Sequence, residues 1–333
     1  MGHQDMHTKR PTIMDVARQA AVSRATASRV LNHGPGVSVE VRRRVQQVIE
    51  DLGYRPDPAA QALASGRSET IELVVLDDCG GSFGSNPYYG RVVTGVVSEI
   101  TTTHAQLRIH VVGRADAPQL LGQIAGTASL GAVLVNVPAP LAEEFYLRCD
   151  RVVSIGRSAP RVPSVETENE AGAYAAVSYL QQRGRRHIAA IHGPRTNSCA
   201  AARREGYLIA MRDAGMPAVS SGGEFCREVG YTHTRKLLAE HADLDALFVA
   251  CDLMATGTLQ ALAESGRRVP DDVAVVGFDD SLIAACASPP MTSVHQPVEE
   301  MAAAATRALL DRRIAPYWRC VLPTSLVVRQ SSG

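Results

Sequence analysis

Long apolar runs are absent from this sequence of 333 residues. No run approaches the roughly 18 residues that a membrane-spanning helix needs, and the opening residues MGHQDMHTKR lack the apolar centre of an export signal. Charged residues make up 20% of the chain and hydrophobic residues 45%, a balance that is typical of folded globular proteins. We therefore expect a cytoplasmic protein that makes no contact with a membrane.

Motifs for metal ions, disulfides and nucleotide-binding enzymes are absent as well. The seven cysteines are odd in number and form no C-x-x-C pair, and the ten histidines form no H-E-x-x-H. The first apolar run is followed neither by G-x-G-x-x-G nor by a Walker loop. These absences predict no metal ion, no cofactor and no catalytic residue, so we do not expect an enzyme.

The net charge of the whole chain is zero, but the charges are unevenly distributed. Residues 1–68 contain ten Lys/Arg and six Asp/Glu, whereas the remaining residues contain 24 and 28. A basic segment ahead of an acidic body favours a polyanion as the partner of that segment alone.

The basic segment has the pattern of three short helices. Thr12 and Asp15 have the spacing of a capping box, and the apolar residues that follow recur with helical periodicity. Ser23 is a good N-cap for a second helix over residues 24–32, and Ser38 for a third that ends at Gly53. Because the connection between the first two helices is minimal, the pattern predicts a helix-turn-helix unit.

The second of these helices has two distinct faces. Its buried face is expected to consist of Ala27, Val30 and Leu31. Its exposed face is expected to carry Arg24, Ala25, Ser28 and Arg29. In a helix-turn-helix protein this end of the second helix enters the major groove of DNA. Arginine can donate two hydrogen bonds to guanine, and alanine can contact a thymine methyl group. A solvated helix face is the alternative for any pair of arginines, but the surrounding pattern favours base contact.

Residues 54–68, YRPDPAAQALASGRS, follow the third helix. Asp57 can cap, and Pro58 can begin, a helix over about 58–64. So short a helix is marginal in water, which predicts a segment that folds on binding. The alternative is a plain interdomain linker, which would not need this apolar helix-forming run.

From residue 70 onward, apolar runs alternate with helical patterns. Buried parallel strands are predicted at 71–78, 107–113, 131–137, 152–156, 187–193, 246–252 and 273–280. Helices are predicted at about 88–104, 116–126, 141–149, 170–184 and 298–313, and a last strand near 321–329. Two successive blocks of this kind predict two doubly wound lobes with a cleft between them.

Several strings together resemble the LacI/GalR family of bacterial transcription regulators. TIMDVARQAAVSRATASRVLN, VSVEVRRRVQQVIEDLGYRP and AAQALASGRS are similar to its head and hinge, and NPYYGRVVTGV and VPDDVAVVGFDDS to its effector domain. The resemblance covers essentially the whole chain. It implies an N-terminal all-α helix-turn-helix head with a hinge helix, followed by a two-lobed α/β effector domain like a periplasmic binding protein.

The resemblance also implies domain limits. They are a disordered tail over 1–9, a DNA-binding domain over 10–55, a hinge over 56–68 and an effector-binding and dimerisation domain over 69–333. Within the last domain, lobe 1 is expected over about 69–166 and 298–318, and lobe 2 over about 167–297 and 319–331.

The DNA-contacting residues that the resemblance implies fall into two groups. Base contacts are expected from Arg24, Ala25 and Arg29, with Leu63 as the hinge leucine that enters the minor groove. Contacts with the DNA backbone are expected from Thr12, Ser23, Thr26, Ser28 and Asn32. Asp57 departs from the asparagine that is usual in the family and adds a negative charge near DNA.

The effector residues that the resemblance implies are Tyr88, Gly156, Arg157, Arg203, Phe225, Cys251, Asp279 and Gln296. In this family the position of Arg203 grips the ligand, and an aromatic residue at the position of Phe225 stacks on a sugar ring. Cys251 stands where Asn, Asp or Ser is common. The loop over 79–85 is longer and richer in glycine than usual, and either reshapes the mouth of the cleft or is flexible.

The function implied by the resemblance is that of a sequence-specific repressor. It binds a palindromic operator as a homodimer, and a small-molecule effector, expected to be a sugar, controls its DNA affinity from the interlobe cleft. No heptad tail for tetramers follows the last strand. A transport-type sugar-binding protein fits the body equally well but needs an export signal and has no basic head. A corepressor-dependent regulator that responds to a purine or a phosphosugar also stays open.

Overall fold

The computed structural model describes residues 12–31, 36–52, 69–77, 82–311 and 314–333. The chain separates into two compact units, residues 1–68 and 69–333. The expected tail over 1–9, the hinge over 56–68 with Leu63, and Asn32 lie outside the described residues. The first half of the glycine-rich loop lies outside them too.

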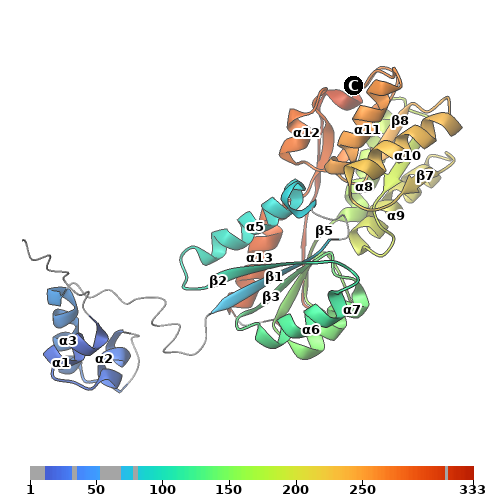
Figure 1. Ribbon diagram of the computed structural model, residues 1–333. Coiled ribbons are helices and arrows are strands. Elements are labelled where there is room, and N and C mark those ends of the chain that lie inside the picture. Colours follow the sequence, from blue (N-terminus) through green and yellow to red (C-terminus); the bar gives the residue numbers. More distant parts are fainter. Residues whose placement is uncertain (1–11, 32–35, 53–68, 78–81, 312–313) are drawn as a thin grey trace, which may run out of the picture. The chain divides into compact units, whose positions relative to one another are not determined.

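The first unit consists of the helices α1 (Ile13–Gln19), α2 (Arg24–Leu31) and α3 (Val39–Leu52), which confirms the expected three helices (Figure 1). At the start of α1, the Thr12 and Asp15 side chains each bond to the other's backbone, so the predicted capping box is formed. Ser23 Oγ accepts the Thr26 backbone N–H at 3.1 Å and caps α2.

The three helices enclose a small apolar core of their own. It is formed by the buried residues Val16, Ala17, Ala20, Ala27, Val30, Val45 and Val48. The side chains are short, so the helices approach one another closely, and each helix contributes residues from one face only. This unit therefore has a hydrophobic centre separate from those of residues 69–333.

The second unit is built on two six-stranded sheets, one in each lobe (Figure 1). The first has the order β11-β5-β4-β3-β1-β2 and comprises β1 (Thr70–Leu76), β2 (Gln106–Val112), β3 (Gly131–Val135), β4 (Val152–Ile155), β5 (Ser164–Thr167) and β11 (Arg319–Leu322). The second has the order β12-β10-β9-β8-β6-β7 and comprises β6 (Ile188–His192), β7 (Val219–Gly222), β8 (Ala246–Val249), β9 (Ala274–Asp279), β10 (Thr292–His295) and β12 (Ser325–Val327). Only the β10–β12 pairing is antiparallel among these described strands.

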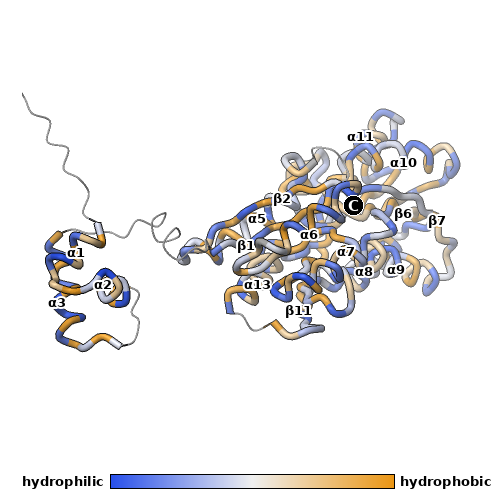
Figure 2. Tube along the Cα trace, turned by 60° about the horizontal axis from the view of Figure 1, so that its bottom comes forward, coloured by the Kyte–Doolittle hydropathy of each residue, from blue (hydrophilic) through white to orange (hydrophobic). Residues whose placement is uncertain are grey.

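Helices cover both faces of each sheet. In the first lobe they are α5 (Pro87–Ile100), α6 (Ala117–Thr127), α7 (Ala139–Arg148) and α13 (Val298–Asp311). In the second lobe they are α8 (Asn169–Gln182), α9 (Ser198–Asp213), α10 (Arg227–Glu240), α11 (Asp252–Glu264) and α12 (Leu282–Cys286). The short 3-10 turns η1 (Ser82–Gly84) and η2 (Gln330–Ser332) complete the described elements. Hydrophilic and hydrophobic residues alternate along the helices in Figure 2, as amphipathic covering helices require.

The central strands are apolar because both faces of each sheet are covered there. Along β1, Leu73 and Val75 pack with α5 and α13, whereas Val74 and Leu76 pack with α6 and α7. A strand that is covered on both faces has no solvent side and reads as a continuous apolar run. This is why the sequence predicts these central strands well.

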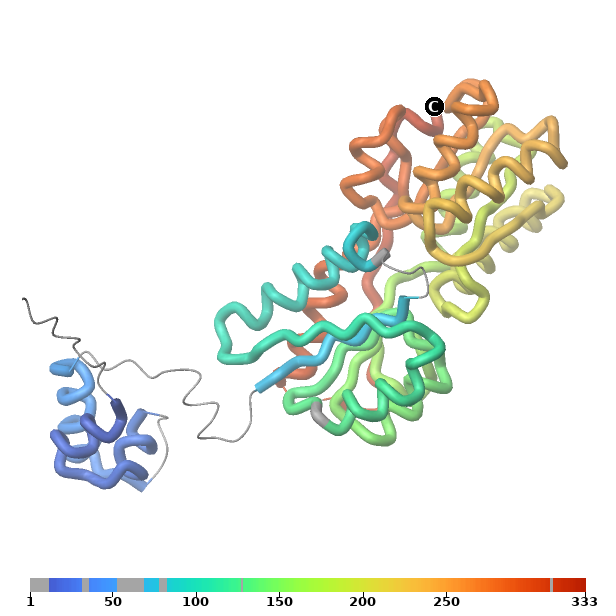
Figure 3. Tube along the Cα trace, viewed as in Figure 1, coloured from blue at the N-terminus to red at the C-terminus, as the bar shows by residue number. Residues whose placement is uncertain are grey.

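The chain passes between the lobes at three places within residues 164–328 (Figure 3). It crosses after β5, after β10, and between β11 and β12. Each lobe is therefore assembled from segments far apart in sequence, and the three crossings are the covalent links about which the lobes can move.

One expected boundary is wrong. The sequence predicts that residues 319–331 belong to lobe 2, with one strand near 321–329, but β11 pairs with β5 in the first sheet, with Arg319 opposite Ser164. The Arg319 Nε lies 2.7 Å from a Glu166 carboxylate oxygen, and Leu322 packs against the first lobe's core. The chain enters the second lobe only at β12, so the single strand is in fact two.

Candidate DNA-binding face and effector cleft

The exposed face of α2 carries the residues that the sequence predicts to read bases. Arg24, Ala25 and Arg29 are exposed, while Ala27 and Val30 on the same helix are buried. Arg18, in contrast, forms an ion pair with Asp15 on its own helix, at 3.1 Å.

No ion pair is found for Arg24 or Arg29 within the described part of the first unit. Their guanidinium groups are therefore available to an external acceptor.

The expected backbone-contacting residues lie at the starts of the first two helices. Thr12 and Ser23 are the capping residues of α1 and α2, and Thr26 and Ser28 lie on α2, half-buried. Hydroxyl groups at these places can donate to phosphate oxygens, which fixes the position of a protein on DNA without reading sequence.

A cavity lies in the cleft between the two lobes of the second unit. Its lining residues are Asn86, Tyr88, Asn136 and Ile155 from the first lobe, and Asn197, Cys199, Arg203, Phe225, Cys251, Asp279 and Gln296 from the second lobe and the crossover after β10. The free space is about 40 Å³, enough for a few water molecules.

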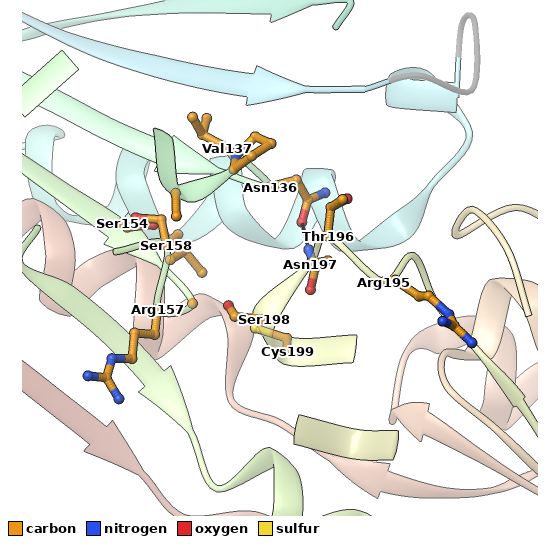
Figure 4. Close-up of a pocket in the computed structure, with 14 residues that line it drawn as sticks. Asn136, Val137, Ser154, Arg157, Ser158, Arg195, Thr196, Asn197, Ser198 and Cys199 are labelled. Carbon is orange, nitrogen blue, oxygen red and sulfur yellow. Dashed lines mark hydrogen bonds between the residues drawn. The ribbon is translucent and has the colours of Figure 1, made fainter. Parts of the chain in front are cut away.

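Six of the eight predicted effector residues line this cavity, namely Tyr88, Arg203, Phe225, Cys251, Asp279 and Gln296. Gly156 and Arg157 line an adjoining space of about 220 Å³ instead (Figure 4). In Figure 4 the Arg157 side chain points away from Asn136 and Asn197. Gly156 has φ +81, and a Cβ there would collide with Cys199 Sγ. The glycine therefore allows the backbone to pack closely against Cys199.

Sequence reasoning missed five lining residues, and three of them share a signal. Asn86 and Asn197 are the N-caps of α5 and α9, and Asn136 follows β3. The Asn197 amide nitrogen donates to Asn136 Oδ1 across the cleft at 3.0 Å (Figure 4). An asparagine directly after a parallel strand or at the next helix start lies at the edge where such folds bind ligands, so all three were open to prediction.

Arg203 is the central charged group of the cavity. Its Nε donates to Asn169 Oδ1 at 2.8 Å and one terminal nitrogen to the Ala250 carbonyl at 2.6 Å. The same nitrogen lies 3.5 Å from Asp279 Oδ1, and the guanidinium stacks on the Phe278 ring, 3.7 Å from its centre. The side chain is 5% exposed, so its orientation is fixed before any ligand arrives.

Asp279 is held in an unusual backbone conformation. Its φ is +114 and that of Asp280 is +50, both in the left-handed region that costs a non-glycine residue about 1–3 kcal/mol. Gln296 Nε2 donates to Asp279 Oδ1 at 2.5 Å. Burial raises the pKa of the Asp279 carboxyl, and the positive charge of Arg203 opposes that shift. Strain of this kind at the end of β9 aims the carboxyl group at the cleft.

The hydroxyl and thiol groups of the cavity remain protonated near neutral pH. Burial raises the pKa values of the Tyr88 hydroxyl and of the Cys199 and Cys251 thiols. Phe225 packs against Gly193, where a Cβ would collide with the ring. The cavity thus offers one guanidinium, one carboxyl group, several amides and apolar surfaces, which suits a polar, uncharged ligand with a ring.

Arg91 joins the two lobes next to this cavity. Two of its nitrogens, Nε and one terminal nitrogen, each lie 2.7 Å from a Glu299 carboxylate oxygen within the first lobe. It also donates to the backbone carbonyls of Asp279, at 2.8 Å, and Gln296, at 3.1 Å. One half-buried side chain therefore ties α5 and α13 to the backbone of a cavity residue in the second lobe.

Behind Asp279, the buried Asp252 accepts hydrogen bonds from the Ser281 N–H and hydroxyl at 2.7 and 2.9 Å and from the Ser293 hydroxyl at 2.6 Å. Burial, and then the charge of Asp279, raise the Asp252 pKa from 3.8 to about 7. A carboxyl group whose pKa is raised on folding contributes stability at low pH and loses it as pH rises.

We therefore expect the free energy of unfolding to fall between about pH 4 and pH 7 as Asp252 ionises in the unfolded chain first. Asp252→Asn should flatten this slope, while costing about 1–3 kcal/mol overall because its amide faces the Ser281 N–H. Urea unfolding of both proteins at several pH values measures this. Parallel slopes in the two proteins would show that Asp252 does not titrate as described.

Within the described residues, no helix is long and apolar enough to cross a bilayer. In the same residues, no group of three or more His, Cys, Asp or Glu side chains could hold a metal ion.

A helix-turn-helix unit joined to a two-lobed unit with a polar cleft defines a ligand-responsive DNA-binding protein. The family model for bacterial regulatory proteins of the lacI family matches residues 12–57, and that for a periplasmic binding protein-like domain matches residues 177–332.

Two curated relatives extend this similarity over nearly the whole chain. The HTH-type transcriptional regulator CelR of Thermobifida fusca is 38% identical, with 97% of this chain and 98% of CelR covered. Catabolite control protein A of Priestia megaterium is 32% identical, with 96% and 99% covered. The chain therefore belongs to the lacI family of bacterial transcriptional regulators.

Solved structures agree with this assignment. The structure titled as a transcriptional regulator CelR–cellobiose complex is 36% identical, with a TM-score of 0.74, and covers 97% of this chain and 100% of its own. The lac repressor dimer bound to operator and the anti-inducer ONPF is 25% identical, with a TM-score of 0.80, and covers 97% and 99%.

Proposed function

We propose that this protein is a transcriptional repressor that binds a near-palindromic operator as a homodimer and is released from it by a sugar in the interlobe cavity. The observation that carries the proposal is the fixed pair of Arg203 and Asp279 in a cavity lined from both lobes. The exposed arginines of α2 supply the DNA-reading half. Two related structures support the two parts of the proposal: the CelR–cellobiose complex supports sugar binding, and the operator-bound lac repressor dimer supports operator binding.

The chemistry of the cavity fits sugar hydroxyl groups. The Arg203 guanidinium donates and the Asp279 carboxyl group accepts, so together they can hold two adjacent hydroxyls through charge-assisted hydrogen bonds. Phe225 offers an apolar face to a sugar ring. Because the free space of about 40 Å³ is smaller than a sugar ring, binding requires the lobes or these side chains to move.

A purine corepressor is the second candidate, and one observation favours it. Tyr88 and Phe225 line the cavity from opposite lobes, and two aromatic rings can enclose a flat base. Calorimetry of the full-length protein with cellobiose, glucose, glucose 6-phosphate, adenine and guanine separates the candidates. Saturable binding of a sugar that weakens operator binding supports our proposal, and binding of a base that strengthens it supports the alternative.

We further propose that the protein acts in the cytoplasm, where operator DNA is found, and catalyses no reaction. Its curated relatives are named as transcriptional regulators. Dimerisation through residues 69–333 would give the twofold symmetry that a palindromic operator matches.

Arg29→Ala is expected to weaken operator binding by about 1–3 kcal/mol and to relax base preference at one position, since a bidentate contact with guanine is lost. Fluorescence anisotropy with the operator and with base-substituted duplexes measures both effects. The matched control is Arg43→Ala on α3, also exposed, which should weaken all sequences alike if Arg43 is near a phosphate. An equal loss for Arg29→Ala on operator and random DNA would contradict base reading.

A further inference from the structure

A second crevice, of about 880 Å³, lies in the second lobe at the carboxyl ends of β6 and β7, beside α9. It shares no lining residue with the central cavity. Its walls combine the loop after β6, the first three turns of α9, the residues at the end of β7 and Arg114 from the first lobe. The proposed sugar site makes no use of these residues.

His192 is the buried polar group of this crevice. As the last residue of β6 it lies on the same face as Ala190, under α9, and its ring packs edge to face on Tyr207 with 5.5 Å between ring centres. The residue is only 5% exposed, and neither ring nitrogen has a hydrogen-bond partner among the described residues. An unsatisfied buried polar group costs about 1–3 kcal/mol, a cost that a phenylalanine of similar shape would avoid.

The His192 imidazole is uncharged at neutral pH. Burial, and then the positive charge of Arg204, lower its pKa to about 4. A neutral imidazole has one N–H donor and one acceptor nitrogen. His192 is therefore an N–H donor beside a positive charge, which is an arrangement that favours an oxygen anion.

The charged residues around His192 leave the crevice with an excess of positive charge. Arg204 on α9 and Arg195 in the preceding loop have no ion pair or side-chain hydrogen bond within the described residues, whereas the neighbouring Arg203 has several. Arg114 also lines the crevice, and the acidic side chains there are Glu205 and Glu224.

Ala200 and Ala201 bring the N-terminal turn of the 16-residue helix α9 to the same crevice. This end of a helix carries a partial positive charge. It adds to the positive charge of Arg204 and Arg195, which also line the crevice.

We propose that this crevice binds a small oxyanion, the phosphate or carboxylate group of a metabolite, independently of the sugar in the central cavity. Arg204 and Arg195 balance its charge. The His192 ring nitrogens are buried in the unliganded protein, and a rotation of the ring toward the crevice lets its N–H donate to one oxygen. The crevice and the central cavity share no lining residue, so an anion bound here touches the lobe that holds the sugar without occupying the sugar's place.

The test uses the full-length protein in a chloride buffer of constant ionic strength, titrated with inorganic phosphate and, separately, with succinate. Calorimetry should show saturable binding of one anion per chain. Arg204→Gln should weaken this binding at least about tenfold, which corresponds to the loss of one charge-assisted contact. Arg212→Gln is the matched control, because Arg212 lies on the same helix, is 71% exposed and does not line the crevice.

The histidine supplies a second readout. In protein labelled with ¹⁵N-histidine, the His192 signal is assigned by its loss in His192→Phe, and it should shift on anion binding in the parent but not in Arg204→Gln. Binding of phosphate alone identifies a phosphate group, and binding of succinate alone a carboxylate. The proposal is overturned by no saturable binding of either anion, by equal binding in Arg204→Gln and Arg212→Gln, or by displacement of the anion by the sugar.

Discussion

Arg203→Met is expected to weaken sugar binding by about 100-fold or more, because two charge-assisted hydrogen bonds of about 1.5–3 kcal/mol each are lost. It should also lower the free energy of unfolding by about 3–5 kcal/mol, since Asp279 then stays buried without its cationic partner. Calorimetry with the sugar and urea unfolding measure the two effects. Methionine replaces the aliphatic part of the side chain, so the loss is that of the guanidinium.

Two further variants keep this prediction testable if Arg203→Met folds poorly. Arg203→Lys retains the charge but loses the fork that contacts Asn169 and the Ala250 carbonyl, and it should bind sugar with intermediate affinity. Arg212→Met changes an exposed residue of the same helix and should match the parent. If Arg203→Met retained the sugar affinity and the induction response of the parent, the cavity would not be the effector site.

Arg91→Met should uncouple the two binding events while leaving each of them in place. The coupling energy between two allosterically linked sites is typically about 1–3 kcal/mol, or about 5–150-fold in affinity, and we expect a value in this range between effector and DNA. Arg91 ties the backbone at Asp279 and Gln296 to Glu299 on α13. Without these bonds, closure of the second lobe on sugar no longer moves α5 and α13, and we expect the coupling to fall to nearly onefold.

The measurement is the operator affinity with and without sugar, and the sugar affinity with and without operator. The two ratios must be equal in any one protein, because coupling is reciprocal. Arg307→Met is the matched control, since Arg307 pairs with Glu99 on α5 and Glu300 on α13 without reaching the second lobe. Full coupling in Arg91→Met, or its loss in Arg307→Met as well, would refute the role of Arg91.

The central strands and the longer helices could be predicted because their periodicity is decided locally. β5, β7 and β10 could not. They have four residues each, as do β4 and β8, which the sequence predicts, but they lack a continuous apolar run. In β7, half-buried and exposed residues alternate, and no strongly apolar side chain follows Val219. The assignment of β11 depends on pairing with β5, some 150 residues earlier in the chain, and no local pattern reports such a pairing.

The residues of the candidate cavity could also be predicted only in part, because some of them depend on contacts between distant segments. Arg203, Phe225 and Asp279 were identified by resemblance, and the structure brings them into one cavity. Arg91 was not identified, because its partners lie 188 to 208 residues away and an arginine on a helix looks like a surface residue in sequence. Gly156 and Arg157 were expected in the same cavity but line the adjoining space, because the chain turns at Gly156 with a positive φ.

The closed apolar core of the first unit bears on how such a protein diversifies. Val16, Ala27 and Val45 pack on one another and on other residues of the first unit, so the stability of the head rests on side chains that face neither DNA nor a ligand. Substitutions at Arg24, Ala25 and Arg29 can therefore change which operator is recognised while the inherited response to a metabolite is kept. The same separation makes the head a transplantable part, and chimaeras joined within residues 53–68 are a direct route to new pairings of operator and signal.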